Sequence, residues 1–249
     1  MPNSRLRQII KFIRVFGIFW GFRLWCTLAI QMGRHCRLLE LRIPGTEAPI
    51  HLRPRDLPIF WQIMVMQEND FQSMPQANQL QEVYRVMLAE GNRPVIIDCG
   101  GHIGLSAVWF ASRFPEAVVY SVEPDASNFT LLQKNTQAYT NVVPLCGGTW
   151  SRCCRLKISN PDAGSASFRL QEVSESVSSE EPSVRGYTVE EIANREQVNR
   201  LYLVKIDVEG AEAEIFEGTT QWLQSTMMVI IELHDWLLPG QGTSKNFFK

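Results

Sequence analysis

The sequence predicts an α/β fold in which a mostly parallel sheet is covered by helices on both faces. From residue 94 onward, short apolar runs alternate with helical stretches, as they do in βαβ units. The segment VIIDCGGHIG, residues 95–104, places its glycines where the first strand would turn into its helix. The 249 residues are 45% hydrophobic and 20% charged, so the chain is long and apolar enough to bury a large core.

Residues 1–34 predict a basic amphipathic helix. Aromatic and aliphatic residues fill the run 5–32. Basic and small residues recur within it at steps of three and four, at Arg7, Lys11, Arg14, Gly17 and Gly21. A membrane span needs about 20 predominantly apolar residues, and the charges of Arg14 and Arg23 interrupt this run. We therefore expect a helix that lies on a membrane surface or packs on the protein's own core or on a partner subunit.

Residues 35–90 predict a hairpin followed by one or two helices. Two short extended runs flank the turn at Pro44–Gly45, and Pro49 and Pro54 disfavour a helix there. Apolar residues then follow at helical intervals from residue 57 to residue 90, with an interruption near Ser73–Pro75. Gly91 follows this stretch, as glycine often follows a helix. This extension leads into a third part, residues 91–249.

The sequence of residues 91–249 predicts five main strands and the helices that connect them. The strands are PVIIDCGG, AVVYSVEP, NVVPLCGG, LYLVKIDVEG and MMVIIELHD, and the helical runs are GLSAVWFASRF, SNFTLLQKNTQAY and EAEIFEGTTQWLQ. Between the third and fourth strands, the polar run QEVSESVSSEEPSVR, residues 171–185, predicts a mobile loop.

Charge and cysteine spacing exclude some functions. A net charge of −2 does not provide the clustered cationic surface that a nucleic-acid partner requires, so none is expected. The 6 cysteines contain no CxxC spacing, so neither a zinc site nor a thioredoxin-like motif is expected. A reducing compartment is the simpler interpretation, and we expect a cytoplasmic protein with membrane association through its first helix.

Two predicted strand ends indicate a nucleoside ligand. The turn after Asp98 matches neither a dinucleotide fingerprint nor a P-loop, although its backbone amides are expected to face a ligand. The Asp98 carboxylate would repel a pyrophosphate and attract a cationic or hydroxyl-bearing ligand. Glu123, at the end of the second strand, occupies the position of an acid that accepts hydrogen bonds from ribose hydroxyls. These features indicate S-adenosylmethionine, whose ammonium and sulfonium groups are both positive.

Four segments in order resemble the FkbM-type methyltransferases. These segments are DCGGHIGLSAVWFASRFPEA, VEPDASNFTLLQKN, LYLVKIDVEGAEAEIFEG and IELHDW, within residues 95–236. The resemblance implies a class I methyltransferase with a Rossmann-like sheet and S-adenosylmethionine as its cofactor. His102 replaces the Asn that is common in the family's glycine loop. The cofactor-binding residues expected on this basis are Asp98, Gly100, Gly101, His102, Gly104, Glu123 and Asp207.

The predicted catalytic residues are Asp207, Glu209 and His234. Lys205, Asp207 and Glu209 alternate with apolar residues at the end of the fourth strand, and His234 ends the fifth. Any of the three could remove the proton of a hydroxyl on a sugar, a lipid or a secondary metabolite while it is methylated. An ion pair between Lys205 and a carboxylate is the alternative explanation. No metal is expected, because no His-rich ligand cluster accompanies the carboxylates.

The C-terminal end leaves a second function class open. A class I methyltransferase sheet normally ends with two further strands, but only residues 237–249 follow Trp236. We therefore expect the last strands to be missing or the sheet to close differently. The alternative function is a catalytically degenerate module that binds S-adenosylmethionine or a partner. The sequence does not specify the methyl acceptor or the oligomeric state.

Overall fold

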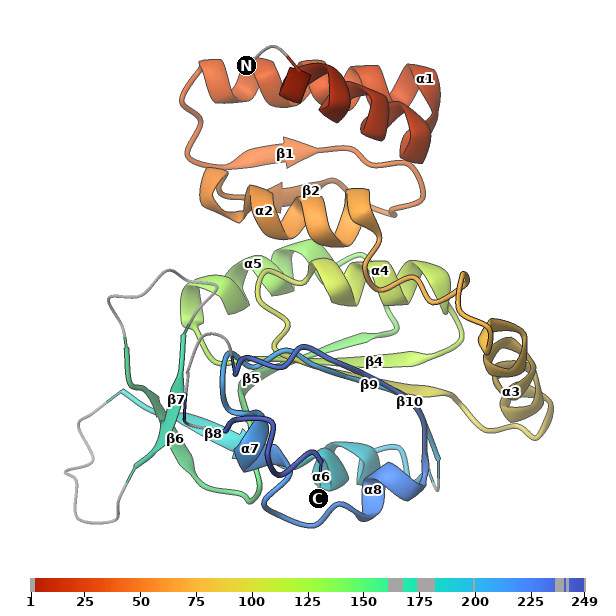
Figure 1. Cartoon of the computed structure of the whole chain (residues 1–249), viewed down its shortest axis with the longest axis vertical. Helices are drawn as coiled ribbons and strands as arrows, with labels where there is room; N and C mark the ends of the chain where they lie inside the picture. Colours follow the sequence, from red (N-terminus) through yellow and green to blue (C-terminus); the bar gives the residue numbers. More distant parts are fainter. Residues whose placement is uncertain are drawn as a thin grey trace.

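The computed structural model describes residues 3–160, 168–173, 182–198, 200–235, 240 and 242–248. Eight strands form its main sheet, in the order β10-β9-β3-β4-β5-β8-β6-β7 (Figure 1). Their bounds are β3 Val95–Cys99, β4 Val118–Glu123, β5 Val142–Thr149, β6 Arg155–Ile158, β7 Leu170–Glu172, β8 Val184–Tyr187, β9 Leu201–Ile206 and β10 Thr226–Ile231. This arrangement confirms the mostly parallel sheet.

The strand order reverses at β3, the strand from which the sheet grows in both directions. This strand pairs in parallel with β4 on one side and with β9 on the other, so the chain proceeds outward from the centre first in one direction and then in the other. In open α/β sheets, ligands bind beyond the carboxyl ends of the strands at such a reversal. The order therefore places the candidate site beside the ends of β3, β4 and β9.

The edge beyond β5 differs from the prediction. Strand β8 pairs in parallel with β5, whereas β6 is antiparallel to both β8 and β7. The polar run 171–185 was predicted to be a loop, but its two ends belong to β7 and β8. Pairing with β6 accounts for this difference, because alternate residues of a polar edge strand can face solvent. The middle of the run, residues 174–181, lies outside the described residues.

Helices cover both faces of the sheet (Figure 1). Helices α4, Leu105–Arg113, and α5, Ala126–Thr136, share one hydrophobic cluster with Ile96 of β3. On the other face, Val95 and Ile97 pack with α6, Val189–Asn194, α7, Glu212–Ile215, and α8, Gln221–Gln224. The period-two alternation along β3 thus divides its apolar side chains between two cores.

The predicted helical run EAEIFEGTTQWLQ is two short helices, α7 and α8, rather than one. Gly218 lies between them, and a Cβ atom at Gly218 would lie 2.6 Å from the carbonyl oxygen of Ser151. The chain therefore passes too close to the loop after β5 for a side chain to fit at this position. This long-range contact has no signal in the helical spacing.

The predicted hairpin is confirmed. Strands β1, Leu39–Leu41, and β2, Ile50–Leu52, are antiparallel. The Asn135 side chain of α5 receives a hydrogen bond from the backbone N–H of His51 at 2.7 Å and donates one to its carbonyl at 2.8 Å. The hairpin is thereby fixed to the helical layer above the sheet.

The helical part of residues 57–90 is also confirmed. A short helical turn η1, Pro54–Asp56, precedes α2, Leu57–Phe60, and the π-helical turn η2, Trp61–Met66. Helix α3, Ala77–Ala89, then lies near β10, and its Tyr84 ring contacts the Tyr202 ring of β9 with 5.0 Å between centroids. Segment 57–66 lies between the first helix and the helices α4 and α5 that cover the sheet (Figure 1), and its η2 turn contacts both α1 and α4.

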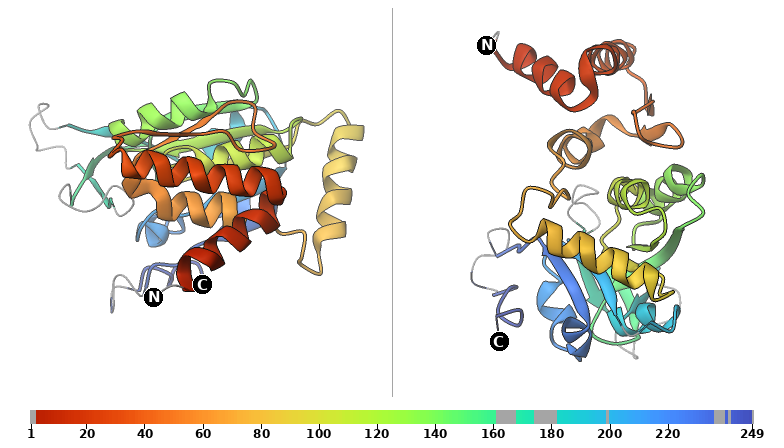
Figure 2. Two further views of the ribbon diagram at one scale, coloured as in Figure 1. Left: turned by 90° about the horizontal axis from the view of Figure 1, so that it is seen from above. Right: turned by 90° about the vertical axis from the view of Figure 1, so that its right-hand side faces the viewer.

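The first helix, α1, Asn3–Gly33, was predicted to be one continuous amphipathic helix, but the structure divides it at Gly17. The φ of Gly17 is 79°, which interrupts helical geometry, and the two halves meet at an angle (Figure 2). A Cβ atom at Gly21 would lie 2.6 Å from backbone atoms of Phe12 and Ile13. The small residues of the predicted stripe thus form the bend and allow the halves to cross closely.

The surface of α1 is largely apolar and exposed. Residues Arg7–Gly33 are long and apolar enough to cross a membrane by length and composition, with a mean hydropathy of 1.4 over an 18-residue stretch of which 11% is buried. The exposed fraction is 78% for Ile18 and 70% for Phe19, which follow the bend. Phe12 faces inward, and its ring contacts that of Trp61 at 5.5 Å.

Candidate functional site

A pocket opens at the carboxyl ends of β3, β4 and β9. It is lined by six parts of the chain: Ile59 and Ile63; Gly100, Gly101, His102, Leu105 and Ser106; Val122, Glu123 and Pro124; Gly148 and Thr149; Phe168 and Leu170; and Lys205, Asp207, Val208 and Glu209. This is the position that the reversal of the sheet at β3 predicts for a ligand.

The glycine turn after β3 fits between two neighbouring strands. The backbone N–H groups of Gly100 and Gly101 both donate to the carbonyl of Val122, at 3.1 and 2.8 Å. A Cβ atom at Gly100 would lie 1.8 Å from the carbonyl oxygen of Asp207. These amides were expected to face a ligand, but the end of β4 uses them, because the turn crosses directly over that strand. Both glycines still line the pocket with their backbone.

Asp98 and Gly104 lie away from the pocket surface. Asp98 is fully buried, and one of its oxygens accepts hydrogen bonds from the hydroxyls of Ser106 and Ser121, at 2.7 and 2.8 Å. Gly104, with φ at 83°, begins α4 close to Leu132 of α5. Neither residue is among those that line the pocket. Their position favours support of the turn over direct contact with a ligand.

Glu123 joins the glycine turn to the end of β4. Its carboxylate accepts hydrogen bonds from the backbone N–H groups of His102 and Asp125, both at 2.9 Å, and from the side-chain amide of Asn128 at 3.1 Å. Only 5% of Glu123 is exposed, and this burial raises the pKa of its carboxyl group to about 7. A largely buried acid at the pocket wall can accept hydrogen bonds from hydroxyl groups of a ligand.

His102 adopts a left-handed backbone conformation, with φ at 48°. Asn is enriched among non-glycine residues in this conformation. This gives a physical reason for the Asn that is common at this position in the glycine loops that the turn resembles. Burial lowers the pKa of the His102 imidazole to about 4, so the ring is neutral near pH 7. Its Nε2 lies 3.8 Å from Oδ1 of Asp56.

Sequence reasoning missed Asp56 and the two isoleucines of the pocket wall. Asp56 is buried, and Arg53 contacts both of its carboxylate oxygens, at 2.7 and 3.0 Å. Ile59 and Ile63 are four residues apart and therefore share one helical face. The spacing of the two isoleucines was visible in the sequence. The glycine turn of the same pocket, however, lies about forty residues further along the chain, so no local pattern connects the isoleucines with the site.

Lys205 forms the ion pair that was the alternative explanation for the charged strand end. Lys205 and Asp98 are register partners on β9 and β3. The Lys205 Nζ lies 3.5 Å from Oδ1 of Asp98 and 3.1 Å from Oδ2 of Asp207. Burial alone would raise the pKa of Asp207, but the Lys205 ammonium lowers it below the ordinary value, so this carboxylate is ionised near neutral pH. Asp207 still lines the pocket.

Glu209, which was predicted to lie at the rim of the pocket, has a side chain that is 25% exposed. Its φ is 53°, and it lines the pocket together with Asp207. Burial raises the pKa of the Glu209 carboxyl group to about 7, and the negative charge of Asp207 adds to this rise. A carboxyl group with a pKa near neutrality is suited to accept a proton.

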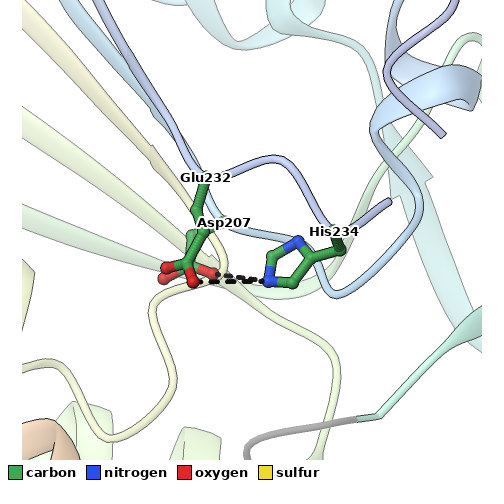
Figure 3. Close-up of side chains that lie close together, drawn as sticks. All are labelled: Asp207, Glu232 and His234. Atoms are coloured by element: carbon green, nitrogen blue, oxygen red, sulfur yellow. Dashed lines mark ion pairs between the residues drawn. The ribbon is translucent and has the colours of Figure 1, made fainter. Parts of the chain in front are cut away.

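His234 lies beside Asp207 (Figure 3) and is not among the residues that line the pocket. Its side chain is 2% exposed, and Nδ1 lies 2.5 Å from a carboxylate oxygen of Glu212. Nε2 points toward Asp207, with its Oδ1 at 3.9 Å. Burial alone would lower the pKa of His234, but the bond to Glu212 and the other nearby carboxylates raise it to about 8. The imidazole is therefore mainly protonated near pH 7, which does not suit a general base.

A sequence profile of the Methyltransferase FkbM domain matches residues 98–247. The chain belongs to the FkbM methyltransferase family. The matched residues begin at Asp98 and include the glycine turn, Glu123, Asp207, Glu209 and His234. The fold of this FkbM domain is the class I sheet described above, and the family's cofactor is S-adenosylmethionine.

One curated relative is the hexuronic acid methyltransferase AglP of Haloferax volcanii. It is 30% identical over 170 residues, which cover 66% of this chain and 66% of that protein. The chain thus spans about two thirds of that relative's length.

Two solved structures show distant likeness. The plantazolicin methyltransferase BpumL in complex with SAH has a TM-score of 0.30 and 11% identity, over 76% of this chain and 62% of that chain. The TYW2 of M. jannaschii in complex with AdoMet has a TM-score of 0.26 and 14% identity, over 44% of this chain and 43% of that chain.

Proposed function

We propose that this FkbM domain transfers a methyl group from S-adenosylmethionine to a hydroxyl group of a sugar-containing acceptor. The observation that carries the proposal is the pocket at the sheet reversal, in which the Glu123 carboxylate on one wall faces the same space as Asp207 and Glu209. Glu123 would accept hydrogen bonds from the ribose, and the two other carboxylates would receive the acceptor. The relative named a hexuronic acid methyltransferase supports a sugar as the acceptor.

In the proposed reaction, the acceptor oxygen attacks the methyl carbon and the bond between that carbon and sulfur breaks. The electron pair of the broken bond stays on sulfur, which leaves S-adenosylhomocysteine, and the hydroxyl proton passes to a carboxylate. Glu209 is the proton acceptor that suits neutral pH, because its pKa is raised to about 7. Asp207 holds the hydroxyl in line with the methyl group. His234 is a positioning residue that acts through Asp207.

A second part of the proposal concerns α1, which we place on an anionic membrane surface. Ile18, Phe19 and Phe22 are exposed beside the bend at Gly17. Arg7 and Arg14 are exposed on the first half of the same element. An apolar surface accompanied by cationic side chains is typical of a helix that binds the membrane interface. On this basis the protein is cytoplasmic and peripherally associated with a membrane.

The activity is tested by incubating the full chain with methyl-labelled S-adenosylmethionine and sugars that carry free hydroxyls, including hexuronic acids and their glycosides. Mass spectrometry should find one added methyl group on an acceptor, and the Asp207→Asn variant should add far less. Cofactor binding without methyl transfer to any sugar, lipid or metabolite extract would instead support the degenerate binding module.

A further inference from the structure

Three side chains at the ends of β9 and β10 have the arrangement of metal ligands. Asp207, Glu232 and His234 each offer one ligand atom, and these atoms all lie within 4.8 Å of one another (Figure 3). Two atoms bound to the same ion can be at most twice the metal–ligand distance apart, which is about 4.2 Å for bonds of about 2.1 Å. Nε2 of His234 is within this limit of both carboxylates, at 3.9 Å from Oδ1 of Asp207 and 3.9 Å from Oε1 of Glu232. The three atoms are therefore close enough to share one ion.

Strand pairing brings the two carboxylates together. Ile231 and Ile206 are register partners at the ends of β10 and β9. The backbone N–H of Glu232 continues this ladder and donates to the carbonyl of Ile206 at 3.0 Å. Asp207 and Glu232, which immediately follow these partners, are held side by side by main-chain hydrogen bonds. Their proximity is therefore a property of the sheet and does not depend on a flexible loop.

A buried carboxylate fixes the orientation of the histidine. Glu212 is fully buried and contacts Nδ1 of His234, whose side chain is 2% exposed. The opposite nitrogen, Nε2, lies 3.9 Å from Oδ1 of Asp207 and 3.9 Å from Oε1 of Glu232. Metal-binding histidines almost always have their other ring nitrogen held by a carboxylate, a carbonyl or water, which sets the tautomer and the ring orientation. The Glu212–His234 contact matches this pattern.

The charges around the three side chains favour a cation. Glu209 adds a further carboxylate, 3.6 Å from Nε2 of His234. The Lys205 ammonium is shared between Asp98 and the oxygen of Asp207 that does not face His234. Several carboxylates at close range therefore face one imidazole, and a divalent cation that binds Nε2 would displace the proton of the imidazolium from the same negative field.

We propose that Asp207, Glu232 and His234 bind one divalent cation of the Mn²⁺ or Mg²⁺ class. Carboxylate oxygens suit Mg²⁺ and Mn²⁺, and the imidazole ligand favours Mn²⁺ of the two. Asp207 also lines the pocket, so a coordination position on the pocket side of the ion can receive the acceptor oxygen. The ion would orient that hydroxyl and lower its pKa. This catalytic use rests on the proposed function, whereas the binding of the ion does not.

The test measures Mn²⁺ binding directly. The full chain, freed of metal with a chelator that is then removed, is titrated with MnCl₂, and the electron paramagnetic resonance signal of free Mn²⁺ is followed. We expect one Mn²⁺ per chain, weakened about tenfold or more in Glu232→Gln. Glu232 has a side chain that is 52% exposed, so this substitution spares the core. Glu82→Gln, which changes an exposed carboxylate on α3, is the matched control and should bind as the unmodified protein does.

Two outcomes would overturn the proposal: no Mn²⁺ bound by the unmodified chain at millimolar metal, or equal binding by the unmodified chain and Glu232→Gln. A thermal unfolding curve of each variant shows that it is folded. Titration with S-adenosylmethionine in the presence of a chelator separates the two proposals. Cofactor binding without Mn²⁺ binding overturns only the metal site, whereas Mn²⁺ binding without cofactor binding overturns only the proposed function.

Discussion

Asp207 makes contacts on two sides, and these contacts have different consequences for catalysis. One oxygen contacts the Lys205 ammonium, and the other faces His234. An aspartate that only neutralised Lys205 would stabilise the fold and have no effect on the rate. Because Asp207 also lines the pocket, our proposal gives it a part in the reaction.

The Asp207→Asn variant separates these roles. Asn is nearly isosteric, so the affinity for S-adenosylmethionine should change by only a few fold, whereas turnover should fall by roughly 10²-fold or more. The melting temperature, the cofactor dissociation constant and the single-turnover rate are measured on the same preparation. A lower melting temperature with an unchanged rate would remove Asp207 from the reaction and leave it as the partner of Lys205.

Glu123 predicts a pH dependence of cofactor binding. In the protein without cofactor, burial raises its pKa to about 7, and hydrogen bonds from ribose hydroxyls would favour the ionised carboxylate. Binding should therefore lower this pKa and release a proton. The affinity should rise as the pH approaches 7 from below and level off above it, because the carboxylate is then already ionised.

The matched variant is Glu123→Gln, which cannot ionise. It should weaken cofactor binding by about 1 to 3 kcal/mol near neutral pH and remove most of the pH dependence below 7. Calorimetry between about pH 5 and pH 8 measures both effects. An unchanged dissociation constant across that range would reject the ribose role of Glu123.

At the scale of the secondary-structure element, the bend of α1 depends on two glycines with different functions. Gly17 supplies the positive φ of the bend, and Gly21 supplies the space in which the second half crosses Phe12 and Ile13. Both glycines were noted in the sequence as members of a helical stripe. Their actual roles arise from a contact between the two halves that helical periodicity does not encode.

Gly21→Ala should lower the stability of the protein. The added Cβ would lie 2.6 Å from backbone atoms, which must move apart, and overpacking of this kind costs about 1 to 3 kcal/mol. Gly33→Ala is the control, because a Cβ there has no atom within 4 Å. Thermal unfolding should show a lower melting temperature for Gly21→Ala alone. Equal melting temperatures for the two variants would contradict the close crossing of the halves.

Elements with a regular period were predictable, whereas those shaped by distant contacts were not. The strands at the sheet centre follow from short apolar runs that alternate with helical stretches, and the hairpin follows from the turn residues around Pro44–Gly45. The pocket positions of Glu123 and Asp207 followed from the rule that ligands bind at strand ends. The burial of Asp98 and the pairing of the glycine amides with Val122 required the strand register, and the contact of Asp56 with the site required the tertiary fold.

At the scale of the whole molecule, one hydrophobic cluster connects α1, the hairpin and the helical layer above the sheet. Phe12, Leu24, Leu39 and Phe110 belong to this cluster. Segment 57–66 has Leu57 and Phe60 on the side of α1, and Ile59 and Ile63 on the side of the pocket. A membrane-bound α1 would therefore hold the pocket at a fixed distance from the lipid surface.

The membrane proposal is tested without disturbing this cluster. Ile18 and Phe19 are 78% and 70% exposed, so the double variant Ile18→Ser, Phe19→Ser removes apolar surface and leaves the core intact. The full chain should sediment with vesicles of phosphatidylserine and phosphatidylcholine at low salt, and the double variant should remain mostly in solution.

Phe248→Ser provides the control, because Phe248 is 72% exposed near the other end of the chain. This variant should bind vesicles as the unmodified protein does. A full chain that ignores anionic vesicles at low salt, or a double variant that binds them equally well, would show that the exposed face of α1 has another role.

The identity of the pocket is tested most directly by calorimetric titration of the full chain with S-adenosylmethionine. We expect saturable binding of one cofactor per chain, heat of proton release that varies with the buffer below pH 7, and marked weakening in Glu123→Gln. Absence of binding at millimolar S-adenosylmethionine by a chain shown to be folded would contradict the assignment of this pocket as the cofactor site.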